Sequence, residues 1–357
     1  MFSKLEEKLQ SFLDIGVPGY EICIYKSGKE IYRKRDGYSS IKDGTPIKGG
    51  ELYNVYSCTK PVTVTAAMML VERGLMSLDD KLSMYLPEFE KMTVKCEGGV
   101  KEAKTPITIK NLFTMTAGFN YNIGNPAFKR ATKETDGRCQ TREVMKYFAN
   151  EPLEFEPGEK FLYSLCHDVL AAVVEVVSGE RFGEFVRKNI FDVCGMTEST
   201  FFLTDELLER VAGHYRHYPE ANEVREIEKQ IIYRLGSEYE SGGAGLLTSV
   251  NDYIKFLEAL RTGKLVKPET LELMTSNQLT TEQEKSKGVG DYSYGLGLRV
   301  PAKDGVTDFG WGGAAGAYLA IDPKNELSIF YAQHVFCYHN RDRDQIIKLV
   351  KEALGCK

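Results

Sequence analysis

Ser57 and Lys60 are the two residues of this chain whose types and spacing are best suited to chemistry. A serine hydroxyl is a poor nucleophile at neutral pH and needs a neighbouring base. The segment reads Ser57-Cys-Thr-Lys60, and residues three apart lie on one face of a helix, so the amine can reach the hydroxyl. Backbone N–H groups at a helix start also point toward a developing oxyanion. The pattern predicts a serine nucleophile activated by a lysine.

The four-residue pattern S-x-x-K is a weak signal when it stands alone. A second copy, Ser39-Ser-Ile-Lys42, occurs in this chain, and about one chance match is expected in a sequence of this composition. The second copy precedes a Gly-Thr-Pro loop rather than a helix, so we expect it at the surface. Ser57 precedes Pro61 and an apolar run typical of a helix, and this context favours Ser57 as the nucleophile.

Other chemistries fit the sequence less well. Cys58 lies only two residues from Lys60, so we expect it to be a small buried hydrophobic residue and not a nucleophile. The nucleophile elbow G-x-S-x-G of many Ser-His-Asp hydrolases does not occur. The run Gly242-Gly-Ala-Gly245 lacks the Lys-Ser/Thr that follows in a phosphate-binding loop, and we expect a packed turn there.

Further sequence blocks accompany Ser57 in a fixed order along the chain. They are Leu70 to Pro87, Ile107-Thr-Ile-Lys-Asn-Leu-Phe-Thr-Met-Thr-Ala-Gly118, Phe155-Glu-Pro-Gly158, Gly242-Gly-Ala-Gly-Leu-Leu-Thr-Ser249 and Phe309-Gly-Trp-Gly-Gly-Ala-Ala-Gly316. Together they resemble the serine β-lactamase and penicillin-binding protein superfamily, for which S-x-x-K is a known signature. The closest branch is the class C-like one, which includes family VIII carboxylesterases and D-aminopeptidases. The resemblance implies hydrolysis through a serine acyl-enzyme and implies no metal or organic cofactor.

Tyr163 occupies the tyrosine position of the superfamily's second motif, Y-x-N, which reads Tyr163-Ser164-Leu165 here. The resemblance implies that this phenol moves a proton beside Lys60. Phenols and amines both titrate at about pH 10, so two such groups in contact can share a proton. Leu165 replaces the amide that contacts the substrate's side-chain amide in β-lactamases. We therefore expect Leu165 to line a substrate pocket that is not adapted to β-lactams.

The superfamily's third motif, K-T-G, reads Trp311-Gly312-Gly313 here. The resemblance implies that the backbone N–H groups of Ser57 and Ala314 form an oxyanion hole, and that a side chain at Gly313 would block the substrate's approach to the strand. The motif's lysine, which helps to hold a substrate carboxylate, is missing. An indole in its place offers an apolar wall and one N–H donor. We expect Trp311, Gly312 and Gly313 to line a pocket for a neutral acyl ester.

The five histidines do not indicate a metal site. The motif H-E-x-x-H does not occur, and the one close pair, His214 and His217, lies in a polar stretch that we expect to be a solvated loop. His167 follows Tyr163 by one helical turn. It either lines the pocket or has a purely structural role, and the sequence does not decide between these alternatives.

Composition favours a small-molecule substrate and a cytoplasmic location. The 357 residues carry a net charge of -5 with a pI near 5.8, which argues against a nucleic-acid partner. Lysine and arginine are dispersed, which argues against a membrane partner, and no apolar run approaches the roughly 20 residues of a membrane span. The N-terminal segment carries charges between its apolar positions and does not resemble a signal peptide. The oligomeric state remains open.

The eight cysteines show no C-x-x-C pair and no regular spacing. In a chain of this length without an export signal we expect them to be reduced thiols. They are Cys23, Cys58, Cys96, Cys139, Cys166, Cys194, Cys337 and Cys356.

The order of the expected elements indicates an α+β fold. We expect a single catalytic unit in which residues 1–60 and 285–357 form an antiparallel β-sheet flanked by terminal helices, with a large, mainly helical insertion over residues 61–284. The strand-like runs are 20–25, 30–34, 294–300, 307–311, 317–321 and 327–331. The helix-like runs are 2–13, 64–74, 108–115, 168–177, 251–260 and 345–354.

The residues together predict a serine hydrolase that acts on small or medium carboxylic esters. A β-lactamase, D-aminopeptidase or amidase would use the same machinery and is the first alternative. The second alternative is a non-catalytic binding protein that inherited the fold. The intact set of Ser57, Lys60 and Tyr163 argues against it, because loss of activity would be expected to erode that set.

Overall fold

The computed structural model describes the whole chain except residues 222, 230–232, 289, 337–340 and 357. The seven cysteines within the described residues are free, and Cys337 lies outside them. Within the same part of the chain, no helix is both long and apolar enough to cross a lipid bilayer.

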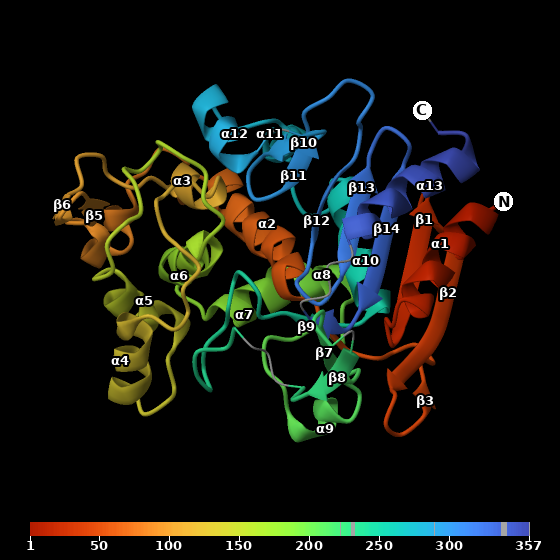
Figure 1. Cartoon of the computed structure of the whole chain (residues 1–357). Helices are drawn as coiled ribbons and strands as arrows, with labels where there is room; N and C mark the ends of the chain where they lie inside the picture. The colour runs from red at the N-terminus through yellow and green to blue at the C-terminus, as the bar shows by residue number, and fades with distance from the viewer. Residues whose placement is uncertain (222, 230–232, 289, 337–340, 357) are drawn as a thin grey trace.

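An eight-stranded antiparallel sheet is built from the two ends of the chain (Figure 1). Strand β1 from the N-terminal end and β14 from the C-terminal end lie side by side, with Ile22 opposite Tyr331. The strand order is β10-β11-β12-β13-β14-β1-β2-β3. The bounds are Gly19–Lys26 for β1, Lys29–Ser40 for β2, Thr45–Pro46 for β3, Tyr292–Tyr294 for β10, Arg299–Pro301 for β11, Phe309–Gly312 for β12, Tyr318–Asp322 for β13 and Leu327–Gln333 for β14. The α+β fold expected from the sequence is confirmed.

Helices cover both faces of this sheet because successive side chains of a strand point to opposite sides. Ile22 packs in one apolar cluster with Leu9 of α1 (Ser3–Asp14) and Ile346 of α13 (Gln345–Leu354). Cys23, the next residue, belongs to a second and larger cluster that includes Phe256 of α10 (Val250–Arg261). The terminal helices therefore lie on one face and α10 on the other (Figure 1).

Helix α2 (Thr59–Glu72) is the central element of the helical part and packs against α6 (Cys166–Ser178). Every residue of α2 from Thr59 to Leu70 is buried, as expected for a helix that is apolar all round. The remaining helices are α3 (Ile109–Phe113), α4 (Pro126–Glu134), α5 (Thr141–Phe148), α7 (Phe182–Val186), α8 (Asp192–Cys194), α9 (Asp205–Leu208), α11 (Pro268–Thr275) and α12 (Thr281–Lys287).

Short sheets interrupt the helical part, where the sequence predicted mainly helix. Strand β4 (Tyr53–Asn54) pairs with β9 (Leu247–Thr248), and β5 (Thr93–Cys96) pairs with β6 (Gly99–Glu102). The solvated loop predicted around His214 is wrong. That segment is β7 (His214–Tyr218), paired with β8 (Glu223–Ile227) and with the distant β15 (Val335–Phe336), and His214 is buried.

The single strand predicted over residues 294–300 is also wrong. The chain turns back within it, so that Tyr294 at the end of β10 pairs with Arg299 at the start of β11. The turn needs Gly297, which has a φ of 82°, a value that residues with a side chain rarely adopt.

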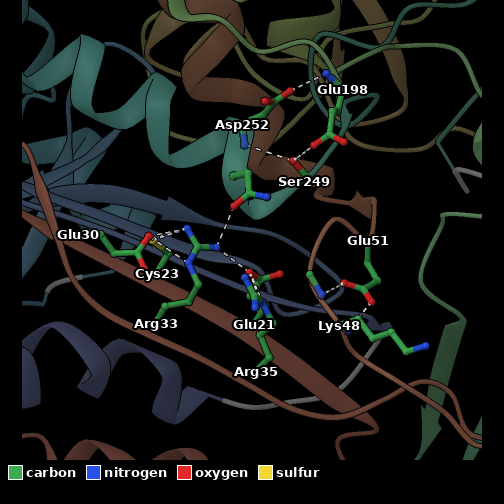
Figure 2. Close-up of polar contacts among 12 residues, drawn as sticks. Glu21, Cys23, Glu30, Arg33, Arg35, Lys48, Glu51, Glu198, Ser249 and Asp252 are labelled. Atoms are coloured by element: carbon green, nitrogen blue, oxygen red, sulfur yellow. Dashed lines mark hydrogen bonds and ion pairs between the residues drawn. The ribbon is translucent and has the colours of Figure 1, made fainter.

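A buried ion network holds the sheet to α10 (Figure 2). Glu21 of β1 is 1% exposed, and its carboxylate accepts hydrogen bonds from Arg33 at 2.7 Å and Arg35 at 2.9 Å. Arg33 also donates to the side chain of Asn251 on α10 at 2.9 Å. Because both arginines converge on one buried carboxylate, its removal would leave Arg33 with Glu30 as its remaining carboxylate partner and would take the ion pair away from Arg35.

We expect Glu21→Ala to lower the free energy of unfolding by about 3 kcal/mol, because it breaks a buried ion pair on one side only. Urea denaturation followed by circular dichroism measures this. Glu282→Ala is the matched control, since the Glu282–Lys285 pair is largely exposed to solvent and should contribute little. A similar loss in both variants would contradict a stabilising role for the buried network.

Candidate active site

Ser57 lies in a tight turn that leads directly into α2. The turn spans Tyr56–Cys58, and Tyr56 has a φ of 46°, in the left-handed region that is costly for a residue with a side chain. The Tyr56 ring is fully buried, and its hydroxyl lies 2.8 Å from Nε2 of His214. Packing around Tyr56 therefore holds the strained backbone that presents Ser57.

Lys60 is fully buried in the first turn of α2, beneath Ser57. Its Nζ lies 3.3 Å from Ser57 Oγ and donates a 2.7 Å hydrogen bond to the carbonyl oxygen of Gly243. The helical spacing predicted from the sequence thus brings amine and hydroxyl into contact.

Tyr163 reaches the same hydroxyl from the segment that precedes α6. Its phenolic oxygen lies 2.7 Å from Ser57 Oγ, and its ring lies 4.6 Å from Lys60 Nζ. The three residues form a continuous hydrogen-bonded set. A proton that leaves Ser57 can therefore move to either partner, which is the requirement for activation of a serine nucleophile.

Tyr121 is a fourth member of this cluster that the sequence reasoning missed. Its phenolic oxygen lies 3.3 Å from Lys60 Nζ, and its ring stacks on that of Tyr163 with centroids 5.5 Å apart. Burial raises the pKa of Tyr121 well above its usual value, and the neighbouring Tyr163 and Asp168 raise it further. Tyr121 is therefore neutral at physiological pH and contributes a hydroxyl dipole next to the ammonium.

The backbone at Gly313, directly after β12, lies against the segment that leads into the nucleophile's turn. A methyl group on Gly313 would lie 2.3 Å from the carbonyl oxygen of Val55, which belongs to the backbone just before the turn. Only glycine allows this approach. The sequence predicted a glycine here to leave room for the substrate, whereas the structure shows that the glycine allows two backbone segments to meet.

A cavity of about 440 Å³ opens in front of Ser57. Its lining includes all the predicted site residues except Lys60, which lies beneath it, and Leu165. The lining residues are Ser57, Tyr163, Arg299, Trp311, Gly312, Gly313, Ala314, Tyr318, Arg343 and Asp344. The indole of Trp311 stacks on Tyr163 with centroids 5.8 Å apart and forms an aromatic wall beside the nucleophile.

Leu165 does not line this cavity, so its predicted place in the pocket is corrected. It immediately precedes α6, is 3% exposed and packs in the apolar core. The side chain turns inward because the segment is entering a helix whose first residues, Cys166 and His167, are themselves buried.

Two arginines bring positive charge to the cavity, which the sequence reasoning did not foresee. Arg299 donates to Asp308 at 2.8 Å and stacks on Tyr292, whose ring centroid is 3.8 Å from the guanidinium carbon. Arg343, just before α13, donates to the carbonyl oxygen of Gly313 at 2.9 Å. No sequence motif marks either arginine. Both are far from Ser57 in sequence and come to the cavity only in the folded chain.

Cys58 and His167 do not have the properties of catalytic groups. Burial raises the pKa of the Cys58 thiol to about 12, so it remains protonated. Burial and the nearby Lys60 lower the pKa of His167 to about 3, and its Nε2 lies 3.4 Å from the carbonyl oxygen of Phe113. His167 is thus a neutral, structural histidine. Among the described residues, no group of three or more His, Cys, Asp or Glu side chains could hold a metal ion.

Comparison with known proteins identifies relatives over nearly the whole chain. Residues 3–349 match the family model described as Beta-lactamase. Esterase EstB of Burkholderia gladioli is 28% identical over 343 residues, covering 87% of this chain and 84% of the relative. Lovastatin esterase of Penicillium rubens is 28% identical over 364 residues, covering 90% of each. The solved structure of EstCE1, described as a hydrolase with promiscuous acyltransferase activity, has a TM-score of 0.82 at 26% identity and covers 98% of both chains.

We expect Gly313→Ala to lower kcat/KM for an ester at least about 100-fold, the effect of losing one oxyanion donor. The new methyl group would push β12, and with it the N–H of Ala314, away from Ser57. Initial rates with a nitrophenyl ester measure this. Gly124→Ala is the control, because its methyl group would meet only the Asn122 side chain, at 3.5 Å. Full activity in Gly313→Ala would show that the close approach is not required.

The two stacked phenols should differ in importance. We expect Tyr163→Phe to lower kcat about 100-fold or more, because it removes a proton carrier in contact with Ser57. Tyr121→Phe should cost only about tenfold, since it removes one hydrogen-bond partner of Lys60. Steady-state kinetics of both variants tests this order, and a larger effect of Tyr121→Phe would reverse the assignment of roles.

Proposed function

The chain belongs to the beta-lactamase family, and from that premise we propose that it is a serine hydrolase that cleaves small or medium carboxylic esters through an acyl-enzyme on Ser57. One observation carries the proposal: Ser57 Oγ lies 2.7 Å from the Tyr163 phenol and 3.3 Å from the Lys60 amine. A serine with two proton carriers in contact, at the edge of a cavity, is an activated nucleophile.

The proposed reaction follows from this arrangement. Ser57 attacks the ester carbonyl while its proton passes to the Tyr163–Lys60 pair, and the N–H groups of Ser57 and Ala314 hold the oxyanion. The same proton then passes to the leaving alkoxide, which departs as an alcohol. Water attacks the acyl-enzyme by the reverse route, and its proton returns to Ser57 as the carboxylic acid leaves.

The preference for esters has independent support. The aromatic wall formed by Trp311 and Tyr163 suits an apolar acyl or alcohol group. Leu165, where the superfamily's motif has an amide, is buried away from the cavity and offers no hydrogen bond to an amide substrate. Two relatives are named as esterases.

Transfer of the acyl group to an alcohol is a second candidate function. The structurally similar EstCE1 is described as having promiscuous acyltransferase activity. The same chemistry would result if an alcohol, rather than water, entered the cavity and attacked the acyl-enzyme. Formation of a new ester in the presence of added alcohol would distinguish transfer from hydrolysis.

The proposal is tested with Ser57→Ala and a panel of nitrophenyl esters, a β-lactam, a D-amino acid amide and an ester that carries a free carboxylate. We expect ester hydrolysis to vanish in Ser57→Ala and a fluorophosphonate probe to label only the wild-type serine. Ser39→Ala, in the second S-x-x-K copy, is the matched control, because its hydroxyl donates to the carbonyl oxygen of Thr45 at the surface. Unchanged hydrolysis in Ser57→Ala would overturn the proposal. Faster turnover of the lactam or amide than of the esters would contradict the proposed ester substrate.

A further inference from the structure

The buried ammonium of Lys60 needs an opposite charge. Its side chain is 0% exposed, and burial of an unpaired charge is strongly unfavourable. The three groups in contact with it, the Ser57 hydroxyl, the Tyr121 hydroxyl and the Gly243 carbonyl, are formally neutral. The compensating charge must therefore come from beyond these contacts.

Asp168 of α6 is a buried carboxylate that no proposed step of the reaction uses. It is 1% exposed, and its Oδ1 accepts hydrogen bonds from Ser241 at 2.6 Å and Tyr239 at 2.9 Å. The Ser241 oxygen itself accepts from the backbone N–H of Ala244, so its hydroxyl proton is directed to Asp168. Two donors on one oxygen favour the ionised carboxylate.

The second oxygen of Asp168 faces the catalytic cluster. Oδ2 is buried, no side chain of the described residues donates a hydrogen bond to it, and the backbone N–H of Gly243 is the donor next to the carboxyl. A methyl group on Gly243 would lie 2.4 Å from this oxygen and 3.1 Å from the Tyr121 hydroxyl. Lys60 donates to the carbonyl oxygen of that same Gly243. The Lys60 amine and the Asp168 carboxylate therefore both lie against Gly243, with the Tyr121 hydroxyl beside them.

We propose that Asp168 is the counter-ion of Lys60 and that, by its effect on Lys60, it sets the charge state of the Ser57–Lys60–Tyr163 cluster. This inference rests on the proposed function. A carboxylate that interacts electrostatically with Lys60 favours an ammonium over a neutral amine. The proton shared by Lys60 and Tyr163 is then drawn toward Lys60, so that Tyr163 accepts the Ser57 proton and passes it to the leaving alkoxide. Asp168 touches neither the nucleophile nor the substrate and is a positioning residue.

The groups that face Asp168 are consistent with this role. Lys60 of α2 is the cation among them, and the others are Tyr121, Tyr239, Ser241 and Cys166. Burial raises the pKa of the Asp168 carboxyl, while the hydrogen bonds from Ser241 and Tyr239 and the charge of Lys60 oppose that rise.

The first test is the pH dependence of kcat/KM in Asp168→Asn. Loss of a negative charge makes protons easier to remove from the cluster, so both limbs of the profile should move to lower pH by about one unit. The plateau should fall about tenfold, because the shared proton is no longer drawn toward Lys60 and away from Tyr163. Tyr239→Phe is the control: it removes one hydrogen bond to Asp168 and leaves the carboxyl and its Ser241 hydrogen bond in place, so its profile should move much less than that of Asp168→Asn.

The second test measures stability and does not depend on activity. Lys60→Met removes the cation, and in that background Asp168→Asn should lower the urea midpoint much less than it does in the wild type. If Asp168→Asn alone fails to fold but the double variant folds, the pairing is supported even more strongly. Equal losses in both backgrounds, including failure of both to fold, would overturn the pairing.

The outcomes separate this inference from the proposed function. Hydrolysis that does not depend on Ser57 refutes the proposed function whatever Asp168 does. Hydrolysis that depends on Ser57, with a pH profile that stays in place in a folded Asp168→Asn variant, overturns only the role of Asp168.

Discussion

A fully buried ammonium under the nucleophile is the constraint on which the site depends. Lys60 reaches Ser57 because the turn that holds Ser57 leads directly into α2, whose first turns are buried. An ammonium in such a place needs acceptors and negative charge around it. The surrounding elements supply the acceptors: Tyr163 before α6, the carbonyl oxygen of Gly243, and the Tyr121 hydroxyl. The catalytic cluster and the core of the helical part are therefore one packed unit.

The sheet contributes the other half of the site through a close backbone contact. Because β12 comes from the C-terminal end of the chain and the Ser57 turn from the N-terminal end, they meet only when both ends join one sheet. Gly313 permits the approach to Val55, and the left-handed conformation of Tyr56 turns Ser57 toward the cavity. Strain at Tyr56 is tolerated because its ring is buried and its hydroxyl contacts His214. Fold stability and presentation of the nucleophile are thus linked.

The sequence predicts the parts of the site that depend on short-range pattern, and these parts are the catalytic residues. Ser57 and Lys60 share a helical turn, and a motif marks Tyr163, so short-range pattern located all three. Tyr121, Arg299 and Arg343 were missed because their places depend on packing between distant segments. The predicted strand over 294–300 failed for a related reason: its apolar pattern suits either a strand or a hairpin, and the tight turn at Gly297 decides. His214 lies in a strand that pairs with β8 and with β15, and β15 comes from more than a hundred residues away.

The arginines of the cavity bear on the expectation that the substrate is a neutral ester. The lysine of the K-T-G motif, which would hold a substrate carboxylate, is absent. Two other cationic side chains, however, line the cavity. Arg299 is paired with Asp308 at 2.8 Å, so its charge is largely compensated within the protein. Arg343 donates to a backbone carbonyl, and the carboxylate of Asp344 lines the same cavity. Two positive groups are thus accompanied by two negative ones. An anionic substrate would compete with these carboxylates for the arginines, whereas a neutral ester would not, and this balance supports the proposal of a neutral ester in a cavity with an aromatic wall.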